Sequence, residues 1–258
     1  MKNAGAHFVL VHGAWYQASC WEKIVPLLEA AGHTVDAVNL PGRDGGQAIE
    51  TVTLDDCVAK VRERVEAAAR PVVLVGHSMG GLTVAQVAEQ VPDRIARLVF
   101  LCAFVPGDGQ ILADLTARPE FRSSLAARYQ RRDFGKGVYT LPAEHAPEVL
   151  FGACAPEVVR EAVDQLVAES LGIGAQPVSV TPAAYGTVRK TYVEAIRDEA
   201  IPLAAQRAMH RAGGCEEVVA LDSDHSPFLS QPEKLAEVFH RLAEPAGDLA
   251  ADPSEVGA

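Results

Sequence analysis

The stretch Val72-Val73-Leu74-Val75-Gly76-His77-Ser78-Met79-Gly80 decides the fold of this chain. Its first four residues are apolar and mostly β-branched, which is typical of a strand that is buried on both faces. A G-x-S-x-G motif follows at residues 76–80 and leads directly into a helical pattern over 79–90. A serine on such a strand-to-helix turn lies near the first amides of the helix, which suit a developing anion. This placement favours a nucleophilic Ser78 over an ordinary turn at the start of a helix.

Short apolar runs like 72–75 recur along the chain and alternate with segments of helical periodicity. The clearest helical segment is 53–69, which has apolar residues three and four positions apart. Fully apolar strands that alternate with helices belong to a parallel sheet covered on both faces. The sequence therefore predicts an α/β fold with a mostly parallel open sheet and helices on both faces. The other predicted strands are 8–11, 33–40, 98–101, 191–193 and 218–221, and the other predicted helices lie near 21–28, over 202–212 and after 230.

The alternation stops after Pro106 and resumes near residue 186. Residues 107–185 are rich in helical patterns interrupted by proline, glycine and arginine. Open α/β sheets bind ligands at the carboxyl edge of their strands, so we expect an inserted, mainly helical cap over that edge. The α/β core then comprises residues 1–106 and 186–243. Residues 244–258 contain mostly alanine, aspartate, proline and glycine and are predicted to form a flexible tail.

A serine hydroxyl needs a base to take its proton, and histidine is the usual base near neutral pH. His225 lies in the loop after the predicted strand 218–221, at the same sheet edge as Ser78. The alternative interpretation is a polar loop residue without a catalytic role. His77 neighbours the serine, but successive side chains on a turn point apart, and His12 is expected to be a structural partner of its own loop. The other histidines are expected to be surface or packing residues: His7, His33, His145, His210 and His240.

The histidine in turn needs a carboxylate that fixes its tautomer. In this architecture the acid comes between the serine and the histidine along the chain. Asp198 is the favoured candidate, because it lies in the loop that follows the strand around residue 192. The alternatives are Glu194 beside that strand, Glu199 one residue further on, and Asp108 after an earlier strand.

The developing oxyanion needs two N–H donors. One is expected from Met79, the residue after the nucleophile, and the other from Ala14 in the His12-Gly13-Ala14-Trp15 loop after the first strand. The alternative for that loop is a simple turn. Five cysteines without a C-x-x-C pair give neither zinc-ligand spacing nor a disulfide framework, so we expect no metal and no cofactor.

The charge balance bears on possible partners. A net charge of −11 and a pI near 5.2 disfavour binding to nucleic acids or to anionic membrane surfaces. No apolar run approaches the length of a membrane-spanning helix, and the first residues do not resemble a signal peptide. We therefore expect a cytoplasmic protein that acts on a small molecule, and a homodimer is possible. One group of arginines could meet an anionic substrate or form a solvated helix face: Arg118, Arg122, Arg128, Arg131 and Arg132.

Taken together, these segments resemble the α/β-hydrolase fold superfamily. The likeness is strongest to the small-molecule esterase and hydroxynitrile lyase group, which includes plant methylesterases and bacterial relatives. It runs to about residue 243 but is poor over 107–145, and it implies that Ser78, Asp198 and His225 are nucleophile, acid and base. The matching stretches are 8–15, 25–33, 76–81, 101–106, 150–157, 198–202, 224–225 and 231–235.

Two departures from this group bear on the reaction. The resemblance implies that hydroxynitrile lyases have a threonine on the oxyanion loop and a lysine directly after the catalytic histidine. Here these positions are Ala14 and Ser226, so the cation that would support a leaving cyanide is missing. We therefore expect a serine esterase that cleaves small carboxylic esters through an acyl-enzyme. The alternatives are a lyase that cleaves carbon–carbon bonds on the same scaffold and a slow-turnover ligand receptor.

Overall fold

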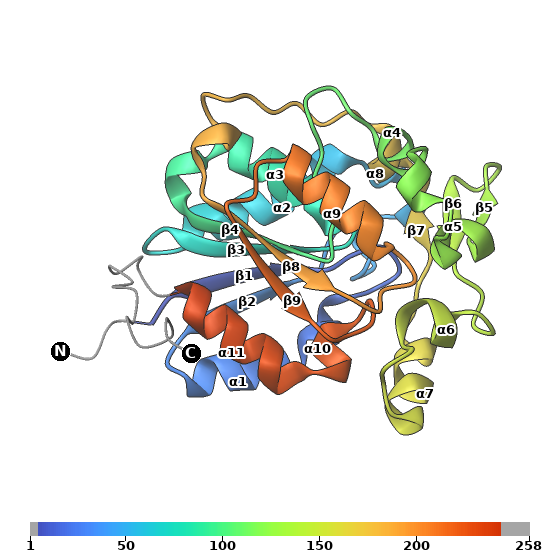
Figure 1. Ribbon diagram of the computed structural model, residues 1–258. Coiled ribbons are helices and arrows are strands. Elements are labelled where there is room, and N and C mark those ends of the chain that lie inside the picture. The colour runs from blue at the N-terminus through green and yellow to red at the C-terminus, as the bar shows by residue number, and fades with distance from the viewer. Residues whose placement is uncertain (1–4, 244–258) are drawn as a thin grey trace, which may run out of the picture.

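A parallel sheet of six strands forms the centre of the protein (Figure 1). The computed structural model describes residues 5–243, so the tail predicted at 244–258 lies outside the described residues. The strand order is β2-β1-β3-β4-β8-β9, and all neighbouring strands are parallel, which confirms the predicted fold class. The strands are β1 (His7–Val11), β2 (Thr34–Val38), β3 (Val72–His77), β4 (Ile95–Leu101), β8 (Lys190–Ala195) and β9 (Glu217–Leu221).

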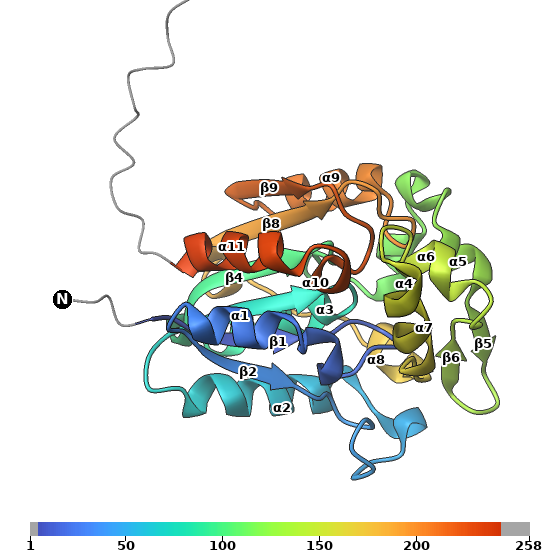
Figure 2. The ribbon, with the colours of Figure 1, turned by 90° about the horizontal axis from the view of Figure 1, so that it is seen from below.

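Helices cover both faces of this sheet (Figures 1 and 2). On one face α1 packs beside α11, and on the other α2 packs beside α3. The start of α2 is fixed by a capping box, in which the side chains of Thr53 and Asp56 each accept the other's backbone amide. The helices are α1 (Ile24–Ala30), α2 (Leu54–Ala67), α3 (Gly80–Gln90), α9 (Leu203–Ala212), α10 (Pro227–Ser230) and α11 (Pro232–Ala243), with 3₁₀ turns η1 (Ala18–Trp21), η2 (Ile49–Thr51), η3 (Pro92–Arg94) and η5 (Tyr185–Thr187).

Burial follows position in the sheet. The central strand β3 is buried at every residue, whereas the edge strand β9 alternates between half-buried and exposed positions before its buried last residue. The strand β3, which leads into the G-x-S-x-G turn, is therefore packed against apolar residues on both faces of the sheet. Among the helices of residues 5–243, none is both long and apolar enough to cross a lipid bilayer.

In the segment predicted as a mainly helical cap, 107–185, the elements from α4 to α8 lie beyond the carboxyl ends of the sheet strands, and the chain after α8 runs back along α3 (Figures 1 and 2). Besides short helices, this segment contains a three-stranded antiparallel sheet of order β5-β6-β7, which the sequence analysis did not predict. Its strands have only two or three residues, too few for an alternating pattern to stand out. The elements are α4 (Leu112–Thr116), η4 (Pro119–Phe121), α5 (Leu125–Tyr129), β5 (Arg131–Asp133), β6 (Val138–Thr140), α6 (Ala146–Leu150), α7 (Pro156–Asp164), β7 (Glu169–Ser170) and α8 (Leu171–Ala175).

A buried ion pair joins this segment to the core. The Arg43 guanidinium donates to the Glu169 carboxylate over 2.6 Å, and the two side chains are 1% and 0% exposed. Arg43 Nε also donates to the Tyr16 carbonyl over 3.1 Å, and Glu169 accepts the Ser170 amide over 2.9 Å. The pair thus connects β7 with the loops that follow β1 and β2.

Breaking this pair should destabilise the fold. We expect Glu169→Ala to lower the free energy of unfolding by about 3–5 kcal/mol, because it leaves the Arg43 guanidinium buried without a counter-ion. The surface pair Arg62–Glu66, with side chains 44% and 52% exposed, provides the control. Glu66→Ala should change the same quantity by less than about 1 kcal/mol. Urea unfolding followed by circular dichroism measures both, and equal losses for the two variants would contradict the expectation.

Candidate active site

Ser78 lies on a strained turn between β3 and α3. Its φ angle is +53°, in the left-handed region that side chains rarely adopt. Backbone hydrogen bonds hold the turn in place. The Ser78 amide donates to the Leu101 carbonyl over 3.2 Å, and the Ser78 carbonyl accepts the amides of Gly81 and Phe104 over 3.1 Å each. Because the turn is bonded to β4 and the loop after it, the serine position is fixed by the sheet itself.

Close backbone contacts explain the glycines around this serine. A Cβ at Gly76 would lie 2.5 Å from the Val84 side chain, and one at Gly80 would lie 2.7 Å from the His12 carbonyl oxygen. A Cβ at Gly13 would lie 2.5 Å from Cβ of Ser78. The loop after β1 therefore approaches the serine closely, as an oxyanion loop must.

The structure brings the predicted serine, histidine and aspartate together. His225 Nε2 is 3.0 Å from Ser78 Oγ, and His225 Nδ1 is 2.7 Å from Asp198 Oδ2. The three residues follow β3, β9 and β8 respectively, at one edge of the sheet. All three are buried. With Nδ1–H bonded to the aspartate, Nε2 is left to accept the serine proton.

Asp198 is held firmly in its loop. Its Oδ1 accepts the amides of Ala200 and Ile201 over 2.8 Å each, and the Gln206 amide approaches Oδ2 at 3.3 Å. Burial raises the pKa of Asp198, whereas the His225 imidazole and the two backbone amides oppose that rise. The carboxylate thus has a full set of hydrogen bonds although no water reaches it.

The alternative acids have other partners. Glu194 lies within β8 and accepts from Arg207 and His210. Glu199 is exposed, and Asp108 accepts the Val180 amide over 3.1 Å. None of these contacts involves His225, so the geometry selects Asp198 from the candidates that the sequence left open.

The loop that carries His225 is tied down by Asp224. Its Oδ1 accepts the Ser226 amide over 3.0 Å, and its Oδ2 accepts the Ala153 amide over 2.8 Å. Ala153 belongs to the segment beyond the sheet edge, so this carboxylate links that segment to the histidine loop. The sequence analysis gave Asp224 no role.

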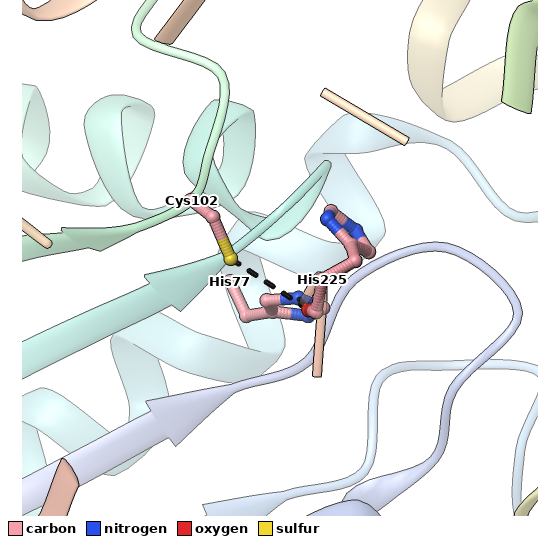
Figure 3. A group of neighbouring side chains, drawn as sticks. All are labelled: His77, Cys102 and His225. Atoms are coloured by element: carbon pink, nitrogen blue, oxygen red, sulfur yellow. Dashed lines mark hydrogen bonds between the residues drawn. The ribbon is translucent and has the colours of Figure 1, made fainter. Parts of the chain in front are cut away.

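His77 and Cys102 contact the main chain of His225 rather than the serine (Figure 3). His77 Nε2–H donates to the His225 carbonyl over 2.9 Å, and the two rings pack with centroids 4.7 Å apart. The Cys102 thiol lies 3.6 Å from the same carbonyl. Burial and the neighbouring His225 lower the pKa of His77, so its ring stays neutral. His77 thus supports the position of His225, a contact across 148 residues that no local pattern reveals.

These three side chains also place possible metal-ligand atoms within 4.8 Å of one another. The site does not fit a metal ion, however. Both ring nitrogens of His225 are bonded to Asp198 and Ser78, and Nε2 of His77 is bonded to the His225 carbonyl. Burial raises the pKa of Cys102, which disfavours the thiolate that metals require.

The predicted oxyanion donors lie beside the serine. Ala14 and Met79 line one cavity together with Ser78 and His225. In the part of the chain that the structure describes, neither of the two backbone N–H groups donates to a protein acceptor. Such unpaired amides next to a nucleophile suit a developing negative charge.

His12 fixes the loop that carries Ala14. Its Nδ1–H donates to the Gly13 carbonyl over 2.9 Å, and its Nε2 accepts the Leu40 amide over 3.2 Å. Burial, with a smaller contribution from Arg43, lowers the pKa of His12 to about 3. His12 is therefore a neutral structural partner of its loop, as the sequence suggested.

The cavity at the serine has a volume of about 380 Å³. Its walls are mostly apolar and come largely from residues 107–185. Tyr139 on β6 also lines it, and its hydroxyl donates to Met79 Sδ over 3.1 Å. The apolar residues that line it include Trp15, Phe104, Ile111, Leu112, Phe121, Phe134, Leu171 and Ile201.

Comparisons with known proteins place this arrangement in context. The profile of the alpha/beta hydrolase family matches residues 8–238. The chain is 30% identical over 258 residues to methyl jasmonate esterase 1 of Vitis vinifera, covering 95% of this chain and 99% of that protein. It is 31% identical over 245 residues to a pyrethroid hydrolase of Sphingobium wenxiniae, covering 92% and 87%. The crystal structure of polyneuridine aldehyde esterase matches with a TM-score of 0.82 at 26% identity, covering 93% and 100%.

The depressed pKa of His12 predicts a loss of stability in acid. Between its ordinary value of 6.5 and its folded value of about 3, the unfolded chain binds a proton that the folded chain does not. Stability should therefore fall as the pH falls from 6.5 towards 3, by up to about 1.4 kcal/mol per pH unit for this histidine. Urea unfolding of the wild type and His12→Gln at pH 6.5 and 4.5 tests this. The variant should have the shallower pH dependence, and parallel profiles would contradict the assignment.

Proposed function

This chain belongs to the alpha/beta hydrolase family and is a carboxylic ester hydrolase, and we propose that it cleaves small, largely apolar esters through an acyl-enzyme on Ser78. The observation that carries the proposal is the hydrogen-bonded line from Asp198 through His225 to Ser78 at the base of the cavity. The three roles follow from this geometry and from the chemistry that a serine nucleophile requires.

Acylation begins when Ser78 Oγ attacks the ester carbonyl carbon. The hydroxyl proton moves to His225 Nε2, and the negative charge of Asp198 stabilises the imidazolium that forms. The carbonyl oxygen becomes an oxyanion, which accepts hydrogen bonds from the amides of Ala14 and Met79. When the tetrahedral intermediate collapses, His225 returns the proton to the departing alkoxide, and an alcohol leaves.

Deacylation repeats these steps with water. His225 takes a proton from a water molecule as the water oxygen attacks the acyl carbon. The bond from the acyl carbon to Ser78 Oγ then breaks, the serine regains its proton from His225, and the acid is released. The neutral His12 and His77 stay outside this proton path, because both are bonded to the main chain.

The cavity supports esters with apolar acyl or alcohol parts. Ser78, His225 and the two amides form its polar end, and most of the remaining lining side chains are hydrocarbon. Burial of apolar substrate surface then contributes roughly 25 cal/mol per Å² to binding. We infer that the apolar walls of the cavity select substrates by shape, while the groups at its polar end carry out the cleavage of the ester bond.

The residue after His225 argues against the lyase alternative, because it is a serine and carries no positive charge. Ser226 is buried, and its Oγ lies 2.6 Å from the Tyr16 hydroxyl. Among the described residues that line the cavity, there is no lysine. The lysine that would support a leaving cyanide is therefore missing from the described lining of this cavity.

Three substitutions test the proposed roles. Ser78→Ala and His225→Ala should each lower kcat for p-nitrophenyl butyrate by about 10³-fold or more, because activation of the nucleophile is lost. Asp198→Asn should also lower kcat strongly, because it favours the wrong tautomer of His225. Glu199→Gln and Ser123→Ala are the matched controls, because both residues are exposed and neither lines the cavity, and they should stay within about twofold of the wild type. Initial rates of p-nitrophenol release measure all five.

Other results would contradict this mechanism or favour one of the alternative functions. A Ser78→Ala variant that retains more than a hundredth of the wild-type rate would rule out the acyl-enzyme. Release of benzaldehyde from mandelonitrile would favour the lyase. Labelling of Ser78 by a fluorophosphonate without turnover on a broad panel of esters would favour the receptor.

A further inference from the structure

One cation faces the cavity. Of the arginines that the sequence analysis considered, only Arg132 is among the residues that line the cavity. It lies on the strand β5 rather than on the helix face considered above. No Asp or Glu is found among the described residues that line the cavity. A single arginine at an otherwise uncharged wall is notable in a chain with a net charge of −11.

The alternation of β5 explains which arginine faces the cavity. Gln130, Arg132 and Phe134 all line it, whereas Arg131 and Asp133 do not. Successive side chains of a strand point to opposite faces, so the even-numbered residues share the face toward the cavity, although all three residues of β5 itself are exposed. On the outer face, Arg131 forms an exposed ion pair with Glu144 at 3.4 Å.

Arg132 is exposed and shares a wall of the cavity with Tyr139, which lies between it and the reacting end. It pairs directly with Tyr139 across the β5–β6 ladder, and directly paired residues have side chains on the same face. The Tyr139 hydroxyl contacts Met79, which follows the nucleophile. Burial and the Glu169 carboxylate raise the pKa of Tyr139, and the positive charges of Arg43 and Arg132 oppose that rise. The positive charge of Arg132 therefore acts on the Tyr139 hydroxyl in this wall of the cavity.

Arg132 has no counter-ion of its own. Arg43 and Arg131 pair with Glu169 and Glu144, but within residues 5–243 no carboxylate forms an ion pair with Arg132. A guanidinium presents parallel N–H donors that match the two oxygens of a carboxylate. One cation neutralises one negative charge, so a carboxylate fits better than a doubly charged phosphate monoester.

We propose that Arg132 binds a carboxylate at the far end of the substrate, so that the preferred substrates are monoesters of dicarboxylic acids. The inference rests on the proposed esterase function. The ester group lies at Ser78, an apolar spacer lies along the hydrocarbon walls, and the free carboxylate meets the guanidinium. Hydrolysis breaks the acyl–oxygen bond of the ester, and water supplies the hydroxyl group of the new acid and the proton of the released alcohol. The product is a dicarboxylic acid.

Turnover of a matched series tests this preference. The substrates are methyl hydrogen succinate, adipate, suberate and sebacate and their dimethyl diesters, with methanol release as the readout. In the wild type the best monoester should exceed its diester in kcat/KM. Arg132→Gln should lower kcat/KM for that monoester about tenfold, mainly through KM, because a charge-assisted hydrogen bond is lost. It should leave the diester within about twofold. A ratio of monoester to diester that Arg132→Gln leaves unchanged would overturn the proposal.

Two further measurements distinguish a failure of the proposed esterase function from a failure of the proposed carboxylate site. Arg131→Gln, one residue away on the outer face, is the matched control and should leave both substrates within about twofold. Binding of the best monoester to Ser78→Ala, measured by titration calorimetry, should weaken about tenfold when Arg132→Gln is added. If the wild type hydrolyses no ester while this binding difference appears, the proposed function fails and the carboxylate site stands. If hydrolysis depends on Ser78 but neither arm responds to Arg132→Gln, only the carboxylate site fails.

Discussion

The left-handed backbone of Ser78 is the constraint on which the rest of the site depends. A residue with φ of +53° persists only where its surroundings hold it. Here its backbone hydrogen bonds with Leu101, Gly81 and Phe104 do so, and the glycines at 13, 76 and 80 leave room for the main chains to approach. The same close approach brings the loop after β1 against the serine. One tight turn thus sets the positions of the hydroxyl and of the amides expected to receive the oxyanion.

Buried carboxylates and neutral histidine rings have different structural roles around this turn. Asp198, Asp224 and Glu169 are buried carboxylates, and each has several hydrogen bonds that compensate for the loss of water. Asp224 and Glu169 join the segment beyond the sheet edge to the histidine loop and to the loops after β1 and β2. His12 and His77, in contrast, stay neutral and hold main-chain groups. Buried carboxylates therefore connect separate segments of the protein, and uncharged imidazoles align the loops.

Much of this could be predicted from the sequence, because the signals were local. The apolar run before Ser78 predicted a central strand, and chain order along one sheet edge pointed to His225 and Asp198. The contacts that were missed join residues far apart, such as Arg43 with Glu169 and His77 with His225. The strands β5 to β7 were too short to show a pattern, so the face of each arginine there could not be predicted. The catalytic roles of the serine, histidine and aspartate, and of the Ala14 and Met79 amides, stay predictions.

The hairpin of β5 and β6 has a consequence for how such a protein can diversify. It lies in one short stretch of chain, supplies Gln130, Arg132, Phe134 and Tyr139 to the cavity wall, and contains none of the three residues that carry the proposed reaction. Phe134 is 78% exposed at the hairpin tip, so little of the folded core depends on this tip, whereas Tyr139 is buried in the core. Ligand choice and bond cleavage are therefore encoded in separable modules. Exchange of the exposed residues from Arg131 to Lys136 would alter ligand choice, whereas the buried Tyr139 contacts Met79 and would have to be retained.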